Sequence, residues 1–176
     1  MSPRQSLRRI WLVTDERQSE RLLPAVAGLP AEAGILFRHY SLPERERRAL
    51  FDEVRAAGGD RMMLLAGAAA LAEEWRADGW HGWGEGEREL LRSASVHDLN
   101  EIRRAEALGA DLLFLAPVHP TRSHPDAPTL GIERFAALAA ATALPVIALG
   151  GVNERNAPEL LANGAYGWAA VDAWLR

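Results

Sequence analysis

The most constraining feature of the sequence is an apolar run without polar alternation, Val146–Gly150, preceded by Pro145 and followed by a second glycine, Gly151. Such a run is typical of a strand buried on both faces, and these strands belong to parallel sheets covered by helices. Asn153 then offers an N-cap for a helix over residues 154–162. A strand, two glycines and a helix start can cradle a phosphate, because the backbone can approach the anion closely. A tight strand–helix turn without a ligand gives the same pattern, so the spacing alone leaves both open.

Further apolar runs alternate with helical patterns along the whole chain. We expect the other strands at residues 10–13, 34–37, 61–65, 79–81, 93–96, 111–115 and 166–169. We expect the helices at residues 19–27, 41–57, 68–76, 98–108, 131–142 and 154–162, with short ones at 85–91 and at the carboxyl end. Ser41 and Glu44 form a capping box at the start of the second helix.

Three similar sequences, at 74–80, 107–113 and 162–168, each combine a helix end, a small or glycine-containing turn and a strand. Because no hairpin signal separates them, they indicate successive right-handed βα units. Eight such units predict an α/β fold, a compact (β/α)8 TIM barrel with shortened helices, as a single domain over residues 1–176. A doubly wound open sheet is the structural alternative.

Composition excludes several classes of function. The chain has no cysteine, so disulfides, thiolate metal sites and cysteine nucleophiles are excluded. Its net charge is −4 and no basic stripe is present, which argues against nucleic acid or a membrane as partner. No apolar run approaches the ~20 residues that cross a bilayer, and Ile10–Val13 is too short for a signal-peptide core. We therefore expect a cytoplasmic protein, and the sequence leaves a homo-oligomer open.

The ends of the expected strands are the places where a (β/α)8 barrel carries its active site. The residues there are Thr14, Asp15, Arg38, His39, Ala66, Gly67, His81, Ser95, His97, His119, Thr121, Gly150, Gly151 and Gly167. All five histidines follow a strand end or lie in the loop after residue 115, and imidazole suits proton transfer near neutrality. For any single histidine, a polar side chain facing water is the simpler interpretation. The histidines lack local ligand spacing and acidic residues are scarce at the strand ends, so no metal site is predicted.

One ordered set of motifs carries a family resemblance. The motifs are Leu12–Asp15, Ser95–His97, Gly109–Asp111, Pro117–Ser123, Gly131, Pro145–Gly151, Asn156 and Gly164–Ala165. In this order and spacing they resemble the thiamine phosphate synthase and TenI-like thiazole tautomerase superfamily. The resemblance covers nearly the whole chain, is strongest from Ser93 onward, and implies a (β/α)8 barrel. The synthase joins a hydroxymethylpyrimidine pyrophosphate to a thiazole phosphate, with Mg²⁺ on the pyrophosphate.

Several parts that the resemblance implies for a synthase are missing from this chain. Ala66–Gly67 stand where the family has Asn-Asp, and His81–Gly86 supply no aspartate, which leaves Glu85 as a substitute. After the second strand Arg38 is present, but Leu36 and Tyr40 replace a glutamine and a lysine, and His124 replaces a lysine in the loop after the sixth strand. These changes remove carboxylates that would hold Mg²⁺ and lysines that would balance the pyrophosphate charge.

The parts that remain are those expected to hold a phosphate monoester and a small ring. The resemblance implies phosphate binding by Gly150, Gly151, Gly167 and Trp168. It implies substrate contacts from Arg38, Ser95, His119, Thr121 and Ser123. The Ser-Val-His sequence matches the tautomerase, in which this histidine is proposed to move a proton on the thiazole, so we expect His97 to be the acid/base.

The resulting hypothesis is a divergent TenI-like member of the superfamily that binds a thiazole phosphate or a related phosphorylated heterocycle. Its activity would be proton transfer without a metal or another cofactor. The first alternative is an active thiamine phosphate synthase that uses Mg²⁺ through substituted ligands, for which Glu85 and Asp15 are needed. The second alternative is a non-catalytic ligand-binding or regulatory protein that keeps the phosphate site.

Overall fold

The structure is a computed structural model that describes residues 7–84, 90–121 and 128–175. Eight strands form one closed, entirely parallel barrel in sequence order. They are β1 (Ile10–Val13), β2 (Gly34–Phe37), β3 (Met62–Ala66), β4 (Gly79–His81), β5 (Leu91–Val96), β6 (Leu112–Leu115), β7 (Val146–Ala148) and β8 (Gly167–Ala170). The barrel closes between the first and last strands, where Ile10 pairs with Trp168 and Leu12 with Ala170. The predicted (β/α)8 barrel is confirmed, and the open sheet is excluded because β1 and β8 pair with each other.

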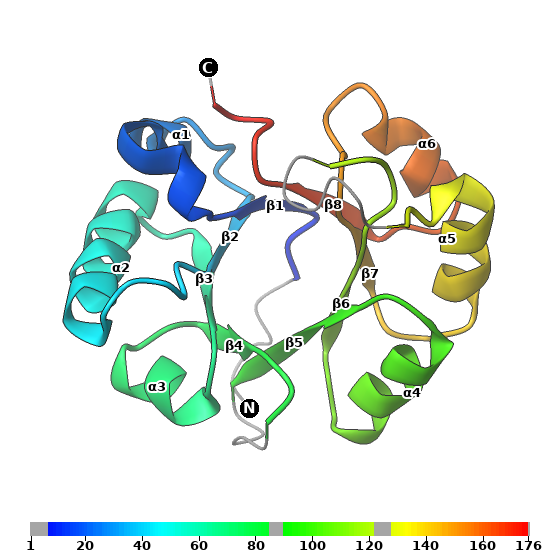
Figure 1. Cartoon of the computed structure of the whole chain (residues 1–176), viewed down its shortest axis with the longest axis horizontal. Helices are drawn as coiled ribbons and strands as arrows, with labels where there is room; N and C mark the ends of the chain where they lie inside the picture. The colour runs from blue at the N-terminus through cyan, green and yellow to red at the C-terminus, as the bar shows by residue number, and fades with distance from the viewer. Residues whose placement is uncertain (1–6, 85–89, 122–127, 176) are drawn as a thin grey trace.

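Short helices surround the barrel on its outside (Figure 1). They are the 3-10 helix η1 (Glu16–Arg21), α1 (Leu22–Ala27), α2 (Glu44–Gly58), α3 (Ala69–Glu74), α4 (Leu99–Ala107), α5 (Gly131–Ala140) and α6 (Ala157–Ala162). α1, α2 and α3 cover one half of the barrel and α4, α5 and α6 the other. Most of the helix expected at 85–91 lies outside the described residues, and Leu91 itself belongs to β5. No helix in the described parts is long and apolar enough to span a bilayer.

The alternation of side chains along each strand divides the core into an inner and an outer part. Trp11 and Val13 point into the barrel, where Trp11 meets Phe114 edge-on with 5.5 Å between ring centroids. Leu12, between them, packs outward against the helices of the first half, as do Met63 and Leu65 of β3. The uninterrupted apolar runs of the sequence reflect this burial on both faces.

Three local predictions differ from the structure. Ser41 does not cap α2: its backbone N–H and hydroxyl bind the Glu16 carboxylate, and the N-cap position is taken by Pro43. Asn153 does not begin α6, which starts only at Ala157; its Oδ1 instead caps the turn that precedes the helix by accepting the N–H of Arg155. The expected helix at the carboxyl end is a bend and turn over the described residues 171–175.

Candidate active site

A cavity of about 590 Å³ opens at the carboxyl ends of the strands. Its wall includes Arg38 after β2, Ser95 and His97 at the end of β5, Thr121 after β6, Gly150 and Gly151 after β7, and Val171–Ala173 after β8. A volume of this size suits a small-molecule ligand. The structure therefore brings six of the expected site residues, from four different βα units, around one space.

Four expected site residues are not among those that line the cavity. Ser123 lies outside the described residues. His119 is half-buried beneath Gly151, and its Nε2 is buried without a hydrogen-bond partner among the described residues. Gly167 and Trp168 begin β8, so they lie at the amino end of the barrel, opposite the cavity. There the Arg9 carbonyl accepts the N–H of Trp168 at 2.8 Å, and a Cβ on Gly167 would lie 2.1 Å from the same oxygen.

The expected placement of Gly167 and Trp168 at the mouth is thus wrong. The glycine is needed for close contact with the chain entering β1, and the turn after β8 that does line the cavity is Val171–Ala173. Both residues lie inside the strand expected at 166–169 as well as inside β8, so their assignment to the phosphate site followed from the family resemblance and not from the strand end.

Gly150 and Gly151 both adopt left-handed backbone, with φ of 96° and 63°. A Cβ on Gly150 would lie 2.7 Å from Cα of Pro117, and one on Gly151 would lie 2.5 Å from the Pro120 carbonyl oxygen. The pair therefore lets the loop after β6 pack on the turn after β7. Within the described residues neither glycine N–H has a hydrogen-bond partner, so both are available to an anion. The helix α6 begins only at Ala157, and its N-cap residue Asn156 donates from Nδ2 to the Gly151 carbonyl at 3.0 Å.

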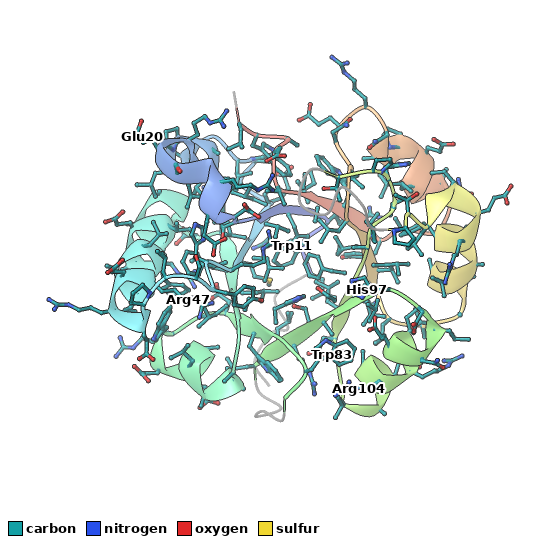
Figure 2. The ribbon with its side chains drawn as sticks, viewed as in Figure 1. Trp11, Glu20, Arg47, Trp83, His97 and Arg104 are labelled. Carbon is teal, nitrogen blue, oxygen red and sulfur yellow. The ribbon has the colours of Figure 1, made fainter. Side chains whose placement is uncertain are left out.

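His97 stands at the cavity on the first residue after β5 (Figure 2). Ser95 lies on the same side of the strand, as alternation predicts, and both side chains line the cavity. His97 does not cap α4: the cap is Asp98, whose Oδ1 accepts the N–H of Glu101 at 2.9 Å. His97 instead holds the Glu101 carboxylate, with its Nδ1 2.8 Å and its backbone N 2.7 Å from Oε2.

Below the cavity, inside the barrel, a polar chain connects three residues. The buried ring of His81 lies between two hydroxyls, with Nδ1 2.8 Å from Ser93 Oγ and Nε2 2.9 Å from Ser95 Oγ. Its edge-to-face contact with Phe114 has 5.4 Å between centroids. Burial, assisted by the charge of Arg38, lowers the pKa of His81 to about 4, so the ring is neutral at pH 7. The hydroxyl of Ser95, a residue of the cavity wall, is thus held from below by a neutral imidazole.

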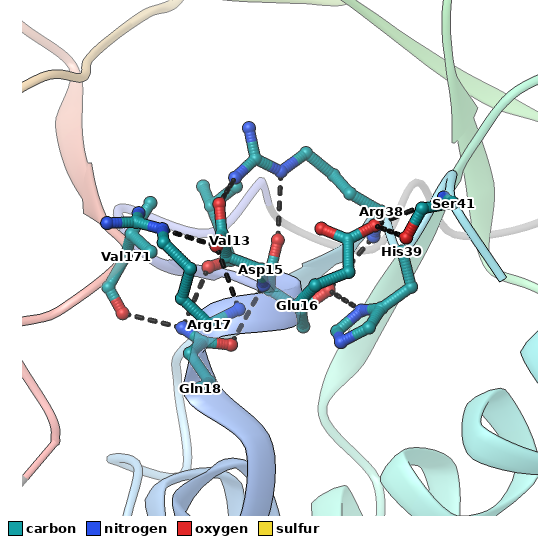
Figure 3. Close-up of polar contacts among 10 residues, drawn as sticks. Val13, Asp15, Glu16, Arg17, Gln18, Arg38, His39, Ser41 and Val171 are labelled. Atoms are coloured by element: carbon teal, nitrogen blue, oxygen red, sulfur yellow. Dashed lines mark hydrogen bonds and ion pairs between the residues drawn. The ribbon is translucent and has the colours of Figure 1, made fainter. Parts of the chain in front are cut away.

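Arg38 reaches the cavity while bound to β1 and its following turn (Figure 3). Its Nε donates to the Thr14 carbonyl at 2.8 Å and its Nη2 to Oδ2 of Asp15 at 2.9 Å. The other oxygen of Asp15 is 2.7 Å from Nε of Arg17. Burial acts to raise the pKa of the Asp15 carboxyl, but the hydrogen bonds from Arg17 and the charges of Arg17 and Arg38 outweigh it and hold that pKa below its ordinary value.

Arg47 is a residue that sequence reasoning missed. It is buried at the start of α2, where its Nε donates to the Arg38 carbonyl at 2.8 Å and its Nη2 to the Ala66 carbonyl at 2.5 Å. It thereby ties the carboxyl ends of β2 and β3 to the helix (Figure 2). The available signal was its spacing, because Arg47 lies four residues before Phe51 on the apolar stripe of α2. Asp172, an acidic residue in the cavity wall, was also missed.

The described residues do not fit a Mg²⁺ site of the kind the synthase alternative needs. Both oxygens of Asp15 are bound by arginines, as described above. At the end of β3 a Cβ on Gly67 would lie 3.9 Å from Nη1 of Arg47, so a cation already occupies the surroundings of the expected carboxylate. In the described parts of the chain, no three His, Asp or Glu side chains gather as metal ligands would. Glu85 lies outside those parts.

The closed parallel barrel, with a glycine pair, an arginine and a histidine around one cavity at its carboxyl face, defines a (β/α)8 barrel protein whose candidate active site is that cavity. Comparison with protein families matches residues 10–174 to the thiamine monophosphate synthase family (TMP-TENI). The chain belongs to this family, which supports a role in thiamine biosynthesis.

Individual relatives are named thiamine-phosphate synthases. A thiamine-phosphate synthase of Pyrococcus horikoshii is 29% identical over 177 residues, covering 94% of this chain and 86% of the relative. A putative thiamine-phosphate synthase of Geobacter sulfurreducens is 35% identical over 184 residues, covering 93% of this chain and 85% of the relative. The match to the Methanococcus vannielii thiamine-phosphate synthase is 41% identical over 85 residues but spans only 48% of this chain and 41% of the relative. The structure of thiamine phosphate pyrophosphorylase from Pyrococcus furiosus superposes with a TM-score of 0.78 at 28% identity, covering 94% of this chain and 86% of that one.

Proposed function

We propose that this chain binds a thiazole phosphate or a related phosphorylated heterocycle in the cavity and transfers a proton on its ring without a metal ion. The observation that carries the proposal is the position of His97 and Ser95 in the same cavity wall as Gly150 and Gly151, whose N–H groups have no hydrogen-bond partner among the described residues. The glycine N–H groups would bind the phosphate, and the histidine would reach the ring.

In this proposal the reaction is an isomerisation. The unprotonated nitrogen of the His97 imidazole takes a proton from a ring carbon, and the resulting imidazolium returns a proton at another position, so no atom or electron is gained or lost. Ser95 and Thr121 would contact the heterocycle, and Arg38, one of whose nitrogens binds Asp15, would place positive charge near the ligand. The surrounding barrel wall would exclude water from the reacting face of the ring.

The described residues do not fit Mg²⁺, which supports proton transfer over synthase chemistry. A pyrophosphate leaving group needs concentrated positive charge at the site. At the cavity Arg38 shares its charge with Asp15, and Asp172 adds a negative charge to the wall. A phosphate monoester demands less compensation, and the backbone N–H groups supply part of it.

The second candidate function is an active thiamine phosphate synthase, and the names of the relatives favour it. That reaction would join a hydroxymethylpyrimidine pyrophosphate to the thiazole phosphate and release pyrophosphate. It would need Mg²⁺ ligands from outside the described residues, with Glu85 as the candidate in the sequence.

One pair of assays on the purified protein separates these functions. We expect incorporation of solvent deuterium into a thiazole carboxylate phosphate, with or without a chelator, and no thiamine phosphate from the two synthase substrates with Mg²⁺. Thiamine phosphate formation would replace the proposal with the synthase alternative. Binding of the thiazole phosphate without either reaction would leave a ligand-binding protein.

A further inference from the structure

Glu101 binds His97 twice through one carboxylate oxygen. A single oxygen, Oε2, receives both the backbone N–H and the Nδ1 of the same residue, His97, at 2.7 and 2.8 Å. Glu101 lies in the first turn of α4, and its own backbone N–H is held by the cap residue Asp98. The carboxylate therefore sits on a fixed backbone, one helical turn from the histidine that it binds.

The contact decides which nitrogen of His97 carries the proton. A carboxylate oxygen can only accept hydrogen bonds, so the neutral imidazole must place its hydrogen on Nδ1. Nε2 is then the unprotonated nitrogen. Because the second hydrogen bond of the same oxygen goes to the His97 backbone, the carboxylate also fixes the position of the ring relative to the end of β5.

We propose that Glu101 is a positioning residue that holds His97 in the Nδ1–H tautomer and presents Nε2 to the cavity as the base. The catalytic effect of Glu101 rests on the proposed function, whereas its effect on the tautomer of His97 is independent of that function. Glu101 is not in the cavity wall and acts only through His97. When His97 takes a proton, the adjacent carboxylate also stabilises the positive charge on the ring.

The α4 helix offers a matched control. Glu106 is on the same helix, but its carboxylate binds Arg103 at 2.8 Å and the Thr142 hydroxyl at 2.6 Å, away from the cavity. Replacing Glu106 by glutamine removes a carboxylate from α4 without touching His97. The cap residue Asp98 remains in all of these variants, so the start of the helix is retained.

The experiment compares the wild type with Glu101→Gln, Glu101→Ala and Glu106→Gln. The ring ¹⁵N NMR signals of His97, assigned by their loss in His97→Asn, are recorded above about pH 8, where free imidazole is neutral. We expect a pure Nδ1–H tautomer in the wild type and in Glu106→Gln, and a tautomer mixture in Glu101→Ala. Glu101→Gln, whose amide can donate as well as accept, should lie between them.

The kinetic arm measures deuterium exchange into the thiazole carboxylate phosphate. Loss of Glu101 should lower kcat roughly 10–100-fold, the size of effect seen when the partner that orients a metal-bound histidine is removed, with KM little changed. An unchanged His97 tautomer in Glu101→Ala, or exchange at the wild-type rate, would overturn the inference. If the wild type itself shows no exchange, the proposed function fails, while the NMR comparison still decides whether Glu101 sets the tautomer.

Discussion

Ser95 Oγ lies 2.9 Å from Nε2 of His81, which links a hydroxyl in the cavity wall to a buried neutral imidazole. Because Ser93 binds the other ring nitrogen, both hydrogen-bonding positions of His81 are satisfied inside the barrel. This hydrogen-bonded pair joins the neighbouring strands β4 and β5 inside the barrel, directly below the cavity. A change at His81 should therefore affect both the position of Ser95 and the stability of the barrel.

The first prediction concerns the pH dependence of stability. Burial lowers the pKa of His81 from 6.5 to about 4 in the folded state, so between these values the unfolded chain binds more protons at this position. The free energy of unfolding should therefore rise with pH from about 4 to about 6.5 and level off above, by on the order of 3 kcal/mol from this residue. Urea denaturation across this pH range measures the effect.

His81→Asn provides the comparison for that slope. Burial also lowers the pKa of His39, and the carboxyl of Asp15 has a lowered pKa, so both contribute with the same sign in wild type and variant. Only the difference between the two curves belongs to His81. Parallel curves for the two proteins would show that His81 is not a buried neutral group.

The second prediction concerns the glycine pair. Gly151→Ala should destabilise the protein by about 2–5 kcal/mol, because it combines left-handed backbone with a clash against the Pro120 carbonyl. Because any side chain at this position also disturbs the loop after β6, the effect on binding is judged against a control with the same backbone strain. Gly109→Ala is the matched control: its φ of 77° is also left-handed, but nothing lies within 4 Å of its Cβ.

We expect Gly109→Ala to cost only about 1–2 kcal/mol and to leave the binding of a thiazole phosphate unchanged. Gly151→Ala should weaken that binding, measured by calorimetry at a temperature where the variant is folded. Equal affinities for the two variants would mean that the phosphate is held elsewhere in the molecule.

The third prediction concerns the buried arginine. Arg47→Ala should lower the free energy of unfolding by about 2–4 kcal/mol, because two carbonyls at the ends of β2 and β3 lose their donor. Arg48→Ala removes the neighbouring, partly exposed arginine, which pairs with Asp52 on the helix surface and lies 5.5 Å from the centroid of the Trp75 ring, and should cost about 1 kcal/mol. Denaturant titration of both variants checks the ranking, and similar losses would contradict the role given to Arg47.

The fourth prediction concerns metal. Because Arg47 occupies the surroundings of Gly67 and Asp15 is bound by two arginines, millimolar Mg²⁺ should neither raise the melting temperature nor be needed for activity. Thermal unfolding with Mg²⁺, with pyrophosphate, and with both separates the contributions. A clear rise in melting temperature only when Mg²⁺ and pyrophosphate are present together would favour the synthase alternative.

The barrel could be predicted because its strands are apolar on both faces, and a run such as Leu112–Leu115 has few other structures to adopt. The grouping of Ser95, His97 and Gly151 followed from the rule that strand ends meet at one face. Contacts between segments that are distant in the chain could not be predicted from the sequence. The Ser41 side chain meets Glu16 from another βα unit, and the start of β8 is set by the chain entering β1. Arg47 gave a readable signal, a charge on an apolar stripe, but its carbonyl partners come from two other strands.

The most direct test of the central claim is solvent deuterium exchange into a thiazole carboxylate phosphate by the wild type and by His97→Asn. The asparagine keeps a polar side chain at the end of β5 but cannot carry the transferred proton. If His97 is the acid/base, the exchange rate should fall roughly 10²–10⁴-fold while binding of the thiazole phosphate is retained. Exchange at an unchanged rate in His97→Asn, or no exchange by the wild type, would contradict the account.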